Sequence, residues 1–260
     1  MQASTGLSWD PLRTIVVAPT FQEAENIVRF LEAVRASVPD ATVLIVDDNS
    51  PDGTGRLADE AARRMGNIEV LHRTGKMGLG SAYREGFRWA LDRGFEVIVS
   101  MDVDFSHDPA TIPALVSRLE AGADAVVGSR YVPGGGTVRW PWHRRMLSRW
   151  GNRYTAAILR LPVKDCTTGF RAYRSQALRA IDPDSTRAEG YAMLTEFVRR
   201  LVRQGLVVVE HPITFVDREY GTSKMSGRIV AESMLLVTGW GLRDAVRGLR
   251  VLLSGRNANR

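Results

Sequence analysis

Two aspartates separated by one residue, Asp102 and Asp104, have the types and spacing best suited to chemistry in this chain. They follow the apolar run 95–101, which is typical of a buried strand, and they precede a loop that ends at Pro109. Carboxylates in such a place are costly unless water or a cation compensates their charge. Magnesium and similar hard cations bind one or two carboxylates and complete their coordination with substrate phosphates. The pair therefore indicates a metal that holds a phosphorylated substrate, and a solvated strand end is the alternative.

More polar groups follow the two predicted strands that come first in the chain, 14–18 and 42–46. Carboxylates there can accept hydrogen bonds from a nucleobase or from ribose hydroxyls. Each segment alone also fits an ordinary turn, as Asp52 followed by Gly53 does. Three strand ends that offer such groups on one edge of a sheet favour a nucleotide pocket. The residues at the first two strand ends are Pro19, Thr20, Glu23, Asp47 and Asp48.

The elements that would position these groups alternate between strand and helix. The apolar runs predict strands at 14–18, 42–46, 68–71, 95–101 and 123–127. Helical periodicity predicts helices at 23–38, 54–65, 81–93 and 109–120. This alternation predicts an α/β fold with a mostly parallel, Rossmann-like central sheet and helices on both faces. In such sheets ligands bind beyond the carboxyl ends of the strands, where the acidic residues lie.

The second half of the chain has a different pattern. A glycine-rich segment is followed by a predicted basic helix, and the end of the chain, 228–253, has an amphipathic pattern. The predicted elements between them are a helix at 143–161, a strand at 168–173, a helix at 193–204 and a strand at 206–215 that Pro212 interrupts.

Composition restricts the compartment and the partners. The 260 residues carry a net charge of +6 and a single cysteine, Cys166, which excludes an internal disulfide and fits a reducing compartment. No N-terminal segment resembles a secretory leader, and no apolar run reaches the roughly 20 residues that span a bilayer. A basic surface predicts an anionic partner such as phospholipid, a phosphate substrate or nucleic acid. We expect a cytosolic or peripheral protein.

The basic charge is concentrated in 137–160, where six arginines occur without an acidic residue. Trp140, Trp142 and Trp150 interleave with them. Aromatic and arginine side chains together are typical of a helix at a membrane interface. Packing of this helix on the sheet is the alternative.

Two nucleotide-binding motifs are absent from the sequence. It has no GxxxxGK[ST] loop, and the glycines at Gly78 and Gly80 lack the third glycine of the dinucleotide fingerprint. Other segments match a known family in their order. They are PTFQEAENI (19–27), VDDNSPDGT (46–54), GKMGLGSAYREGF (75–87), MDVDFSHDP (101–109), GSRYVPGG (128–135) and TTGFRAYR (167–174). Over about 14–225 the chain resembles the polyprenyl-phosphate mannose synthases, which are inverting family 2 glycosyltransferases with the GT-A fold.

The resemblance implies a role for each matching position. Asp102 and Asp104 would bind Mg²⁺ or Mn²⁺ and the diphosphate of GDP-mannose, and Asp104 and Arg130 would be catalytic. The nucleotide pocket would contain Pro19, Thr20, Glu23, Asp47, Asp48, Lys76, Asp102 and Val103. The acceptor phosphate would contact Arg130, Arg218 and Lys224, while Ser106 and Asp165 would orient the sugar or the acceptor. Ser106 stands where some relatives have glutamine, so direct coordination of metal by its hydroxyl is disfavoured.

The acceptor implied by the resemblance is a polyprenyl monophosphate. Its second pKa is near 6, so it is ionised at neutral pH and needs little help from a general base. The resemblance also divides the chain into an N-terminal tail (1–12), a catalytic domain (13–217) and an acceptor loop with amphipathic helices (218–260). These helices would lie against the cytoplasmic face of a membrane, with or without a separate membrane-anchoring protein.

Two alternatives remain at the level of the sequence. One is a polyprenyl-phosphate glucose synthase that uses UDP-glucose. The other is a non-catalytic basic adaptor that binds lipid or nucleic acid. The acidic cluster would repel a phosphate backbone and no RNA-binding module is recognised, so we expect no nucleic-acid partner.

Overall fold

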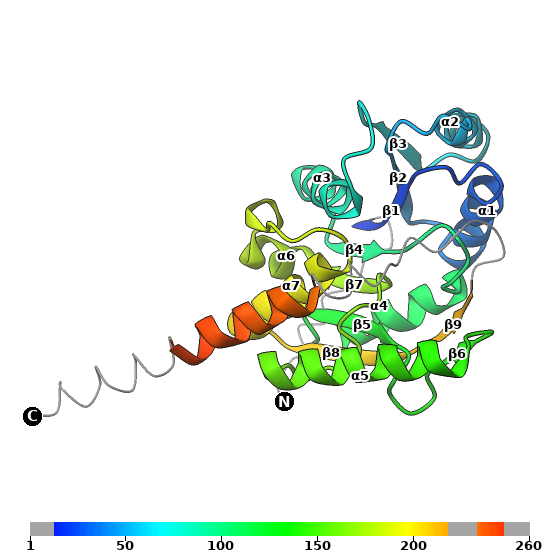
Figure 1. The fold of residues 1–260 in the computed structure, drawn as a ribbon. Coiled ribbons are helices and arrows are strands. Elements are labelled where there is room, and N and C mark those ends of the chain that lie inside the picture. The colour runs from blue at the N-terminus through cyan, green and yellow to red at the C-terminus, as the bar shows by residue number, and fades with distance from the viewer. Residues whose placement is uncertain (1–12, 218–232, 247–260) are drawn as a thin grey trace, which may run out of the picture.

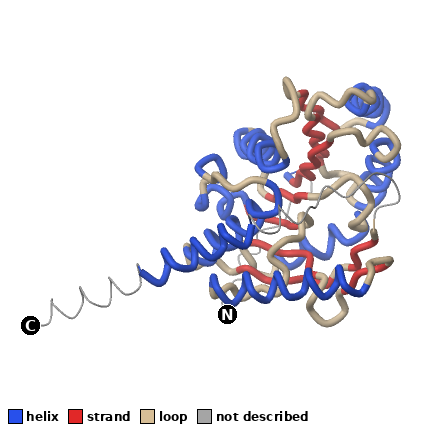
Figure 2. The backbone as a smooth tube through the Cα atoms, in the orientation of Figure 1, coloured by secondary structure: helices blue, strands red, loops and turns tan. Residues whose placement is uncertain are grey.

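The computed structural model describes residues 13–217 and 233–246. The predictions for the tail 1–12, for Arg218 and Lys224, and for 247–260 lie outside the described residues. A seven-stranded sheet forms the centre, in the order β3-β2-β1-β4-β7-β5-β8 (Figures 1 and 2). Its strands are β1 (Thr14–Thr20), β2 (Thr42–Asp47), β3 (Ile68–His72), β4 (Val97–Ser100), β5 (Ala125–Ser129), β7 (Arg171–Arg174) and β8 (Val208–Pro212).

All neighbouring strands of this sheet run parallel except β7, which is antiparallel to both β4 and β5. The mostly parallel sheet predicted from the sequence is therefore confirmed. Alternate residues of β1 point to opposite faces, as a strand requires. Val16 and Ala18 pack in one hydrophobic cluster, while Ile15 and Val17 pack in the other.

Helices cover both faces of the sheet (Figure 1). The first cluster contains residues of α1 (Ile27–Ser37), α2 (Thr54–Met65) and α4 (Ile112–Glu120). The second contains residues of α3 (Leu79–Asp92), α6 (Ser175–Ile181) and α7 (Gly190–Arg203). The short helices η2 (Pro109–Thr111) and η3 (Pro183–Ser185) precede α4 and α7. A central sheet with helices packed on both faces confirms the predicted α/β fold.

Several predicted boundaries were wrong for identifiable reasons. The helix predicted from residue 23 begins at Ile27, because the N–H groups of Glu23 and Ala24 donate to Thr54 Oγ1 (2.9 Å) and Asp52 Oδ2 (3.1 Å) in the loop after β2. The strand predicted at 168–173 begins only at Arg171. The strand predicted at 95–101 is the shorter β4, and the one at 123–127 is shifted to 125–129.

The strand predicted at 206–215 is two strands that belong to different sheets. Pro212 ends β8, since proline cannot donate to a ladder. The chain continues as β9 (Thr214–Val216), which pairs in parallel with β6 (Gly136–Val138). Neither β6 nor α6 was expected from the sequence pattern.

The basic segment forms α5 (Trp142–Leu159), close to the prediction. Helical residues 233–246 lie across its C-terminal part, where the Tyr154 hydroxyl is 2.7 Å from Thr238 Oγ1. A side chain at Gly241 would overlap Ile158, so glycine permits this close approach. None of the helices in the described parts of the chain is both long and apolar enough to cross a membrane.

Candidate active site

The loops that follow β1, β2 and β4 meet at one edge of the sheet. Thr20 is the register partner of Asp47, and the Met101 N–H donates to the carbonyl of Val17 (3.2 Å). The carboxyl ends of three strands therefore present their polar groups together, as predicted. We call the four aspartates of these loops, Asp47, Asp48, Asp102 and Asp104, the acidic edge.

Asp102 and Asp104 differ in their surroundings. The side chain of Asp102 is 33% exposed, and its Oδ1 accepts from the Tyr83 hydroxyl (3.3 Å). Burial, and secondarily the charge of Asp102, raises the pKa of Tyr83 well above its usual value, so Tyr83 remains a proton donor. Asp104 is 6% exposed and accepts hydrogen bonds from the backbone N–H (3.0 Å) and hydroxyl of Ser106. The structure thus places Ser106 as a support for Asp104.

The space beside Asp102 depends on a glycine. A Cβ atom at Gly169 would lie 3.2 Å from Asp102 Oδ2, so a larger residue would crowd the carboxylate. The described residues contain no cluster of three or more His, Cys, Asp or Glu side chains that could hold a metal. Two carboxylates nevertheless fit a hard cation that takes its remaining ligands from water and from a diphosphate.

Asp47 and Asp48 are held by the protein itself. Asp47 accepts from the Thr20 hydroxyl (3.0 Å) and from both the N–H (3.1 Å) and hydroxyl (2.6 Å) of Ser50. Asp48 forms an ion pair with the buried guanidinium of Arg73 and accepts from the Met77 N–H (3.3 Å). These contacts fix the shape of the loop after β2.

Arg73 is a residue that the sequence analysis missed. Its side chain is 1% exposed and also donates to Glu85 (2.8 Å) and to the Ser81 hydroxyl. It connects the loop after β2 to the start of α3. The position of Arg73 directly after β3, on the same edge as the acidic residues, was the available signal.

The other residues predicted for the nucleotide pocket lie on the same edge. The Lys76 Nζ lies 4.1 Å from the centre of the Phe21 ring, a cation–π contact. Glu23 is partly buried and accepts from the Asn26 amide (2.9 Å). Pro19 is partly exposed, whereas the Val103 side chain packs in the core. Only the backbone of Val103 is therefore available to a ligand.

Arg130 follows β5 and forms a buried ion pair with Asp165. Its Nε and Nη2 donate to the two carboxylate oxygens, both at 2.7 Å, and Nη2 also donates to the Thr167 hydroxyl (2.7 Å). Burial would raise the pKa of Asp165, but the charge and hydrogen bonds of Arg130 lower it below the usual value. The guanidinium carbon lies 5.5 Å from the ring centres of Trp140 and Phe215. The structure places Asp165 as the partner that orients Arg130.

His107 is a second residue that the sequence analysis missed, although it lies within the segment 101–109. Its ring is buried and packs against the rings of Phe170 and Phe215, with centroids 5.3 Å apart in each case. Burial lowers the pKa of His107 to about 4, so the ring is neutral at neutral pH. Its Nδ1 lies 4.0 Å from Asp102 Oδ2. His107 therefore stands between the acidic edge and the aromatic residues around Arg130.

Comparison with known proteins identifies the family of this site. The sequence profile described as glycosyl transferase family 2 matches residues 15–182. The chain belongs to glycosyltransferase family 2. The family 2 chain is 48% identical to an undecaprenyl-phosphate mannosyltransferase of Micrococcus luteus, over 93% of this chain and 99% of that protein. It is 45% identical to a polyprenol monophosphomannose synthase of Mycolicibacterium smegmatis, over 91% of each.

Solved structures show that this family 2 chain has the GT-A fold. A glucosyl-3-phosphoglycerate synthase from Mycobacterium tuberculosis, in complex with Mn²⁺, UDP-glucose and phosphoglyceric acid, superposes with a TM-score of 0.63 at 18% identity. The match covers 87% of this chain and 79% of that one. A mannosyltransferase from Pyrobaculum calidifontis, in complex with GDP-Man and Mn²⁺, has a TM-score of 0.59 at 18% identity, over 92% and 66% of the chains.

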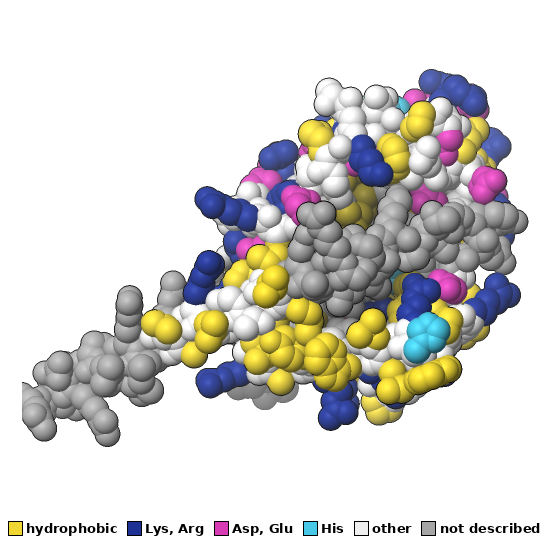
Figure 3. All heavy atoms as spheres, in the orientation of Figure 1, with side chains coloured by type: hydrophobic (Ala, Val, Ile, Leu, Met, Phe, Trp, Pro, Cys, Tyr) yellow, Lys and Arg dark blue, Asp and Glu magenta, His cyan; other side chains and the backbone are white. Residues whose placement is uncertain are grey.

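The outer surface of α5 in this glycosyltransferase is apolar and basic (Figure 3). Trp142 is 67% exposed and Trp150 is 58% exposed. We define the α5 face by its large exposed apolar side chains, Trp142, Met146, Leu147, Trp150 and Ile158. Exposed arginines stand beside them at 139, 145, 149 and 153. Nearby, residues 233–246 expose Leu235, Leu236, Leu242 and Val246.

Two residues predicted for this interface were placed wrongly. Trp140 is only 7% exposed, because its ring packs against Phe215 at a centroid distance of 5.2 Å. Arg144 lies over the Trp140 ring and pairs with Asp217 (2.9 Å). Trp140 therefore packs inside the protein, while Arg144 stays partly exposed and is held over the Trp140 ring by Asp217.

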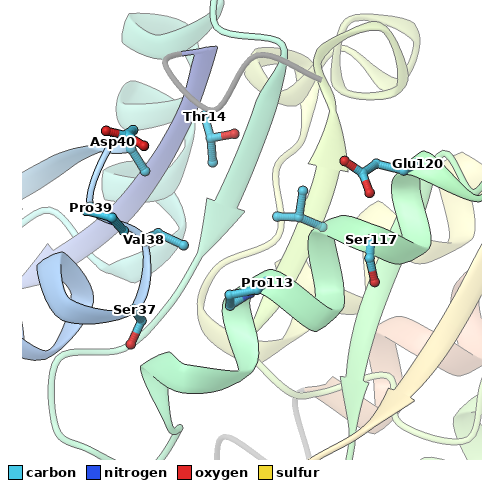
Figure 4. Close-up of a pocket in the computed structure, with 10 residues that line it drawn as sticks. Thr14, Ser37, Val38, Pro39, Asp40, Pro113, Ser117 and Glu120 are labelled. Atoms are coloured by element: carbon cyan, nitrogen blue, oxygen red, sulfur yellow. The ribbon is translucent and has the colours of Figure 1, made fainter. Parts of the chain in front are cut away.

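One apolar pocket of the family 2 chain lies away from the acidic edge (Figure 4). It has a volume of about 260 Å³ and contains Thr14 at the amino end of β1. Val38, Pro39, Pro113 and Val116 from the surrounding helices and loops also line it. Because the acidic residues follow the carboxyl ends of the strands, this pocket is not the active site.

Proposed function

We propose that this family 2 glycosyltransferase transfers mannose from GDP-mannose to a polyprenyl monophosphate, with inversion, and forms polyprenyl-phosphate mannose. The similarity at 45–48% identity to two enzymes named for this type of acceptor, over nearly the whole chain, carries the proposal. The acidic edge at the carboxyl ends of parallel strands is consistent with a site for a sugar nucleotide. A polyprenyl-phosphate glucose synthase is the alternative that the experiment below distinguishes.

In the proposed reaction Asp102 and Asp104 would hold Mn²⁺ or Mg²⁺, and the bound cation would supply positive charge to the diphosphate leaving group. Ser106 fixes the orientation of Asp104 through two hydrogen bonds. Asp47 and Asp48 shape the nucleotide side of the site, and Lys76 and Glu23 lie at its rim. These side chains are ordered before the substrate arrives, which reduces the cost of reaching the transition state.

The acceptor side of the proposed reaction needs positive charge more than a base. The lipid monophosphate is already ionised at neutral pH, so its oxygen attacks the anomeric carbon as the bond to GDP breaks. Arg130 is the described arginine nearest to this role, since Asp165 and Thr167 hold its planar guanidinium in one orientation. Arg218 and Lys224 are proposed to join it at the acceptor phosphate. Attack from the face opposite the leaving group gives inversion.

We also propose that the α5 face docks on the cytoplasmic surface of a membrane, where the lipid acceptor lies. Large apolar side chains surrounded by arginines suit the boundary between acyl chains and anionic headgroups. Each basic residue near an anionic surface contributes about 1 kcal/mol. The proposal predicts flotation of the purified protein with anionic vesicles. Flotation only in the presence of an integral membrane protein would favour a separate anchoring partner instead.

The proposed activity is tested with purified protein, a polyprenyl monophosphate in detergent, Mn²⁺ or Mg²⁺, and radiolabelled GDP-mannose or UDP-glucose in parallel. Label from GDP-mannose is expected in the lipid fraction, and chelation of the metal should prevent its incorporation. Incorporation from UDP-glucose alone would replace the mannosyl assignment by the glucosyl one. Incorporation that continues in excess chelator would contradict the metal-dependent mechanism.

A further inference from the structure

His107 lies at the junction of the two halves of the site, and the function proposed above gives it no role. It follows Asp104 by three residues, in the loop after β4. Its ring is packed between Phe170 and Phe215, and the Phe215 ring in turn contacts Trp140 and faces Arg130. The ring therefore has little rotational freedom, and the directions of its two nitrogens are fixed by packing.

Thr168 contacts one of the two ring nitrogens of His107. The Phe170 N–H donates to Thr168 Oγ1 (3.4 Å), so that oxygen already accepts a hydrogen bond. Thr168 Oγ1 also lies 3.5 Å from Nε2 of His107, and a threonine oxygen can accept two hydrogen bonds as well as donate one, so this contact fits either tautomer of the ring. A neutral imidazole has one donor and one acceptor nitrogen. The Asp102 carboxylate on the Nδ1 side favours the tautomer in which Nδ1 carries the hydrogen and Nε2 accepts from the Thr168 hydroxyl.

The Nδ1 atom has no hydrogen-bond partner among the described residues, although it is buried. An oxygen of a proposed metal ligand, Asp102 Oδ2, lies 4.0 Å from Nδ1. This separation is beyond a hydrogen bond. A buried N–H without a partner is unfavourable, so the arrangement favours a carboxylate that moves closer. Asp102 is partly exposed, and the Tyr83 hydroxyl holds its other oxygen, Oδ1.

We propose that His107 is a positioning residue for Asp102, which fixes the carboxylate through an Nδ1–H donor while the carboxylate binds the divalent cation. The proposal rests on the metal-binding role of Asp102 proposed above. Tyr83 and His107 would hold the two oxygens of Asp102 from opposite sides, as Ser106 holds Asp104. Loss of such a supporting partner typically weakens metal affinity about 10–100-fold.

Three substitutions separate this role from simple packing. His107→Asn places an amide nitrogen near the position of Nδ1, His107→Gln places one near Nε2, and His107→Leu keeps only apolar volume. The measurement is Mn²⁺ affinity in the presence of GDP, read from the electron paramagnetic resonance signal of free Mn²⁺. We expect the Gln and Leu variants to bind Mn²⁺ about 10–100-fold more weakly. The Asn variant should retain most of the wild-type affinity.

Thermal unfolding of each variant provides the control for packing. A structural role alone would lower the melting temperature and leave Mn²⁺ affinity the same in all folded variants, and that result would overturn the proposal. Thr168→Val adds a variant that leaves the ring in place but removes the hydroxyl donor to Nε2. It should weaken Mn²⁺ binding, because the proton is then free to move to Nε2. Wild-type affinity in Thr168→Val would also count against the proposal.

A second readout requires no metal. The chain has four histidines, so nitrogen-15 spectra of the imidazole rings can be assigned by comparison with His107→Gln. The Nδ1–H form is expected for His107 at neutral pH. Observation of the Nε2–H form would overturn the proposal, since Nδ1 would then have no hydrogen to donate.

Failure of this inference is distinguishable from failure of the proposed function. Asp104→Asn serves as the reference variant, because it removes a proposed metal ligand directly. If Asp104→Asn loses Mn²⁺ binding while His107→Leu retains it, only the role of His107 is wrong. If wild-type protein and Asp104→Asn bind Mn²⁺ equally, the metal role of the acidic edge is wrong, and the inference about His107 fails with it.

Discussion

The acidic edge and the α5 face are built in opposite ways. Three of the four aspartates of the acidic edge are buried, and all four take part in hydrogen bonds or ion pairs with other parts of the protein. The apolar residues of the α5 face point outward and are about 40–70% exposed. The first arrangement fixes charged groups before a substrate binds, which suits chemistry. The second leaves apolar area and arginines available to a surface, which suits docking.

The region between them has features of both. Arg130 is as buried as the acidic residues, yet it lies among Tyr131, Trp140 and Phe215, whose rings continue toward α5. A charged group in aromatic surroundings is well placed for a substrate with an anionic head and an apolar tail. The contrast implies three different effects of substitution. Changes in the acidic edge should abolish sugar transfer, and changes at Arg130 should affect both protein stability and use of the acceptor. Changes on the α5 face should affect only docking on a membrane.

The largest effect is expected at the acidic edge. Asp104→Asn should reduce transfer by about 10²–10³-fold or more, because it removes a carboxylate ligand of the cation that would stabilise the leaving diphosphate. The fold should survive, since an asparagine oxygen can still accept from the Ser106 N–H. Initial rates with saturating Mn²⁺ and far-ultraviolet circular dichroism check both statements.

Asp108→Asn is the matched control, because Asp108 is exposed and asparagine caps a helix as well as aspartate does. It should leave the rate unchanged. Metal-dependent transfer by Asp104→Asn at a near-normal rate would remove the acidic edge from the chemistry.

The next largest effect is expected for the buried pair of Arg130 and Asp165. Asp165→Asn leaves the Arg130 charge without its partner and should lower the free energy of unfolding by about 3–5 kcal/mol. Arg130→Lys keeps the charge but loses the two parallel hydrogen bonds, so it should raise the acceptor KM more than the donor KM. Chemical denaturation and steady-state kinetics measure the two effects.

The half-exposed pair of Arg144 and Asp217 provides the comparison, since such pairs contribute about 1 kcal/mol or less. Asp217→Asn should therefore change stability much less than Asp165→Asn. Equal losses for the two variants, or a larger rise in the donor KM for Arg130→Lys, would contradict the role given to Arg130.

A smaller effect is expected on the α5 face. Replacement of Trp142 and Trp150 by serine should weaken binding to anionic vesicles by several-fold or more, because apolar side chains contribute about 1.5–3 kcal/mol each when fully buried. The fold should be unaffected, since both side chains are already exposed. Vesicle co-sedimentation at increasing salt gives the affinity and its electrostatic part.

Val207→Ser removes an exposed apolar side chain on the loop before β8 and should not change vesicle binding. If the two tryptophan substitutions are equally silent, the α5 face does not dock on lipid.

The smallest effect is expected for the chemical reactivity of the single cysteine, Cys166, which follows Asp165 of the buried Arg130–Asp165 ion pair. Burial raises the pKa of Cys166 to about 12, so the thiol is protonated and shielded at pH 8. Thiol reagents should modify it only as the protein unfolds. The pKa of Cys166 in the folded protein is higher than its value of 9.0 in the unfolded chain. The stability that the protonated thiol contributes is therefore fully present below pH 9 and is lost as the pH rises toward 12. Rapid labelling of native protein at pH 8 would show that the interior next to Asp165 is open.

The sequence predicts the fold well where a local pattern determines structure. Apolar runs such as 14–18 and 42–46 form neighbouring parallel strands, and the polar residues after them meet at one edge. The antiparallel insertion of β7 between β4 and β5 was not predictable, because it depends on pairing between segments far apart in the chain. Pro212 was recognised as an interruption, but the separate pairing of β9 with β6 depends on tertiary contacts.

The sequence predicts the candidate site less completely. It locates the acidic edge and Arg130, because their types and strand-end positions are local features. It does not show that Asp48 pairs with Arg73, or that Asp165 holds Arg130, since these partners are 25 and 35 residues apart. Trp140 and Trp142 look equivalent in the sequence, yet only the structure shows that Phe215 covers one of them.

The most direct test of the central claim is calorimetric titration of GDP into the protein with and without Mn²⁺. If the acidic edge holds a metal against a nucleotide diphosphate, Mn²⁺ should tighten GDP binding by about tenfold or more in the wild type. The same coupling should disappear in Asp102→Asn and Asp104→Asn. Equal GDP affinity with and without Mn²⁺ in the wild type would contradict the account.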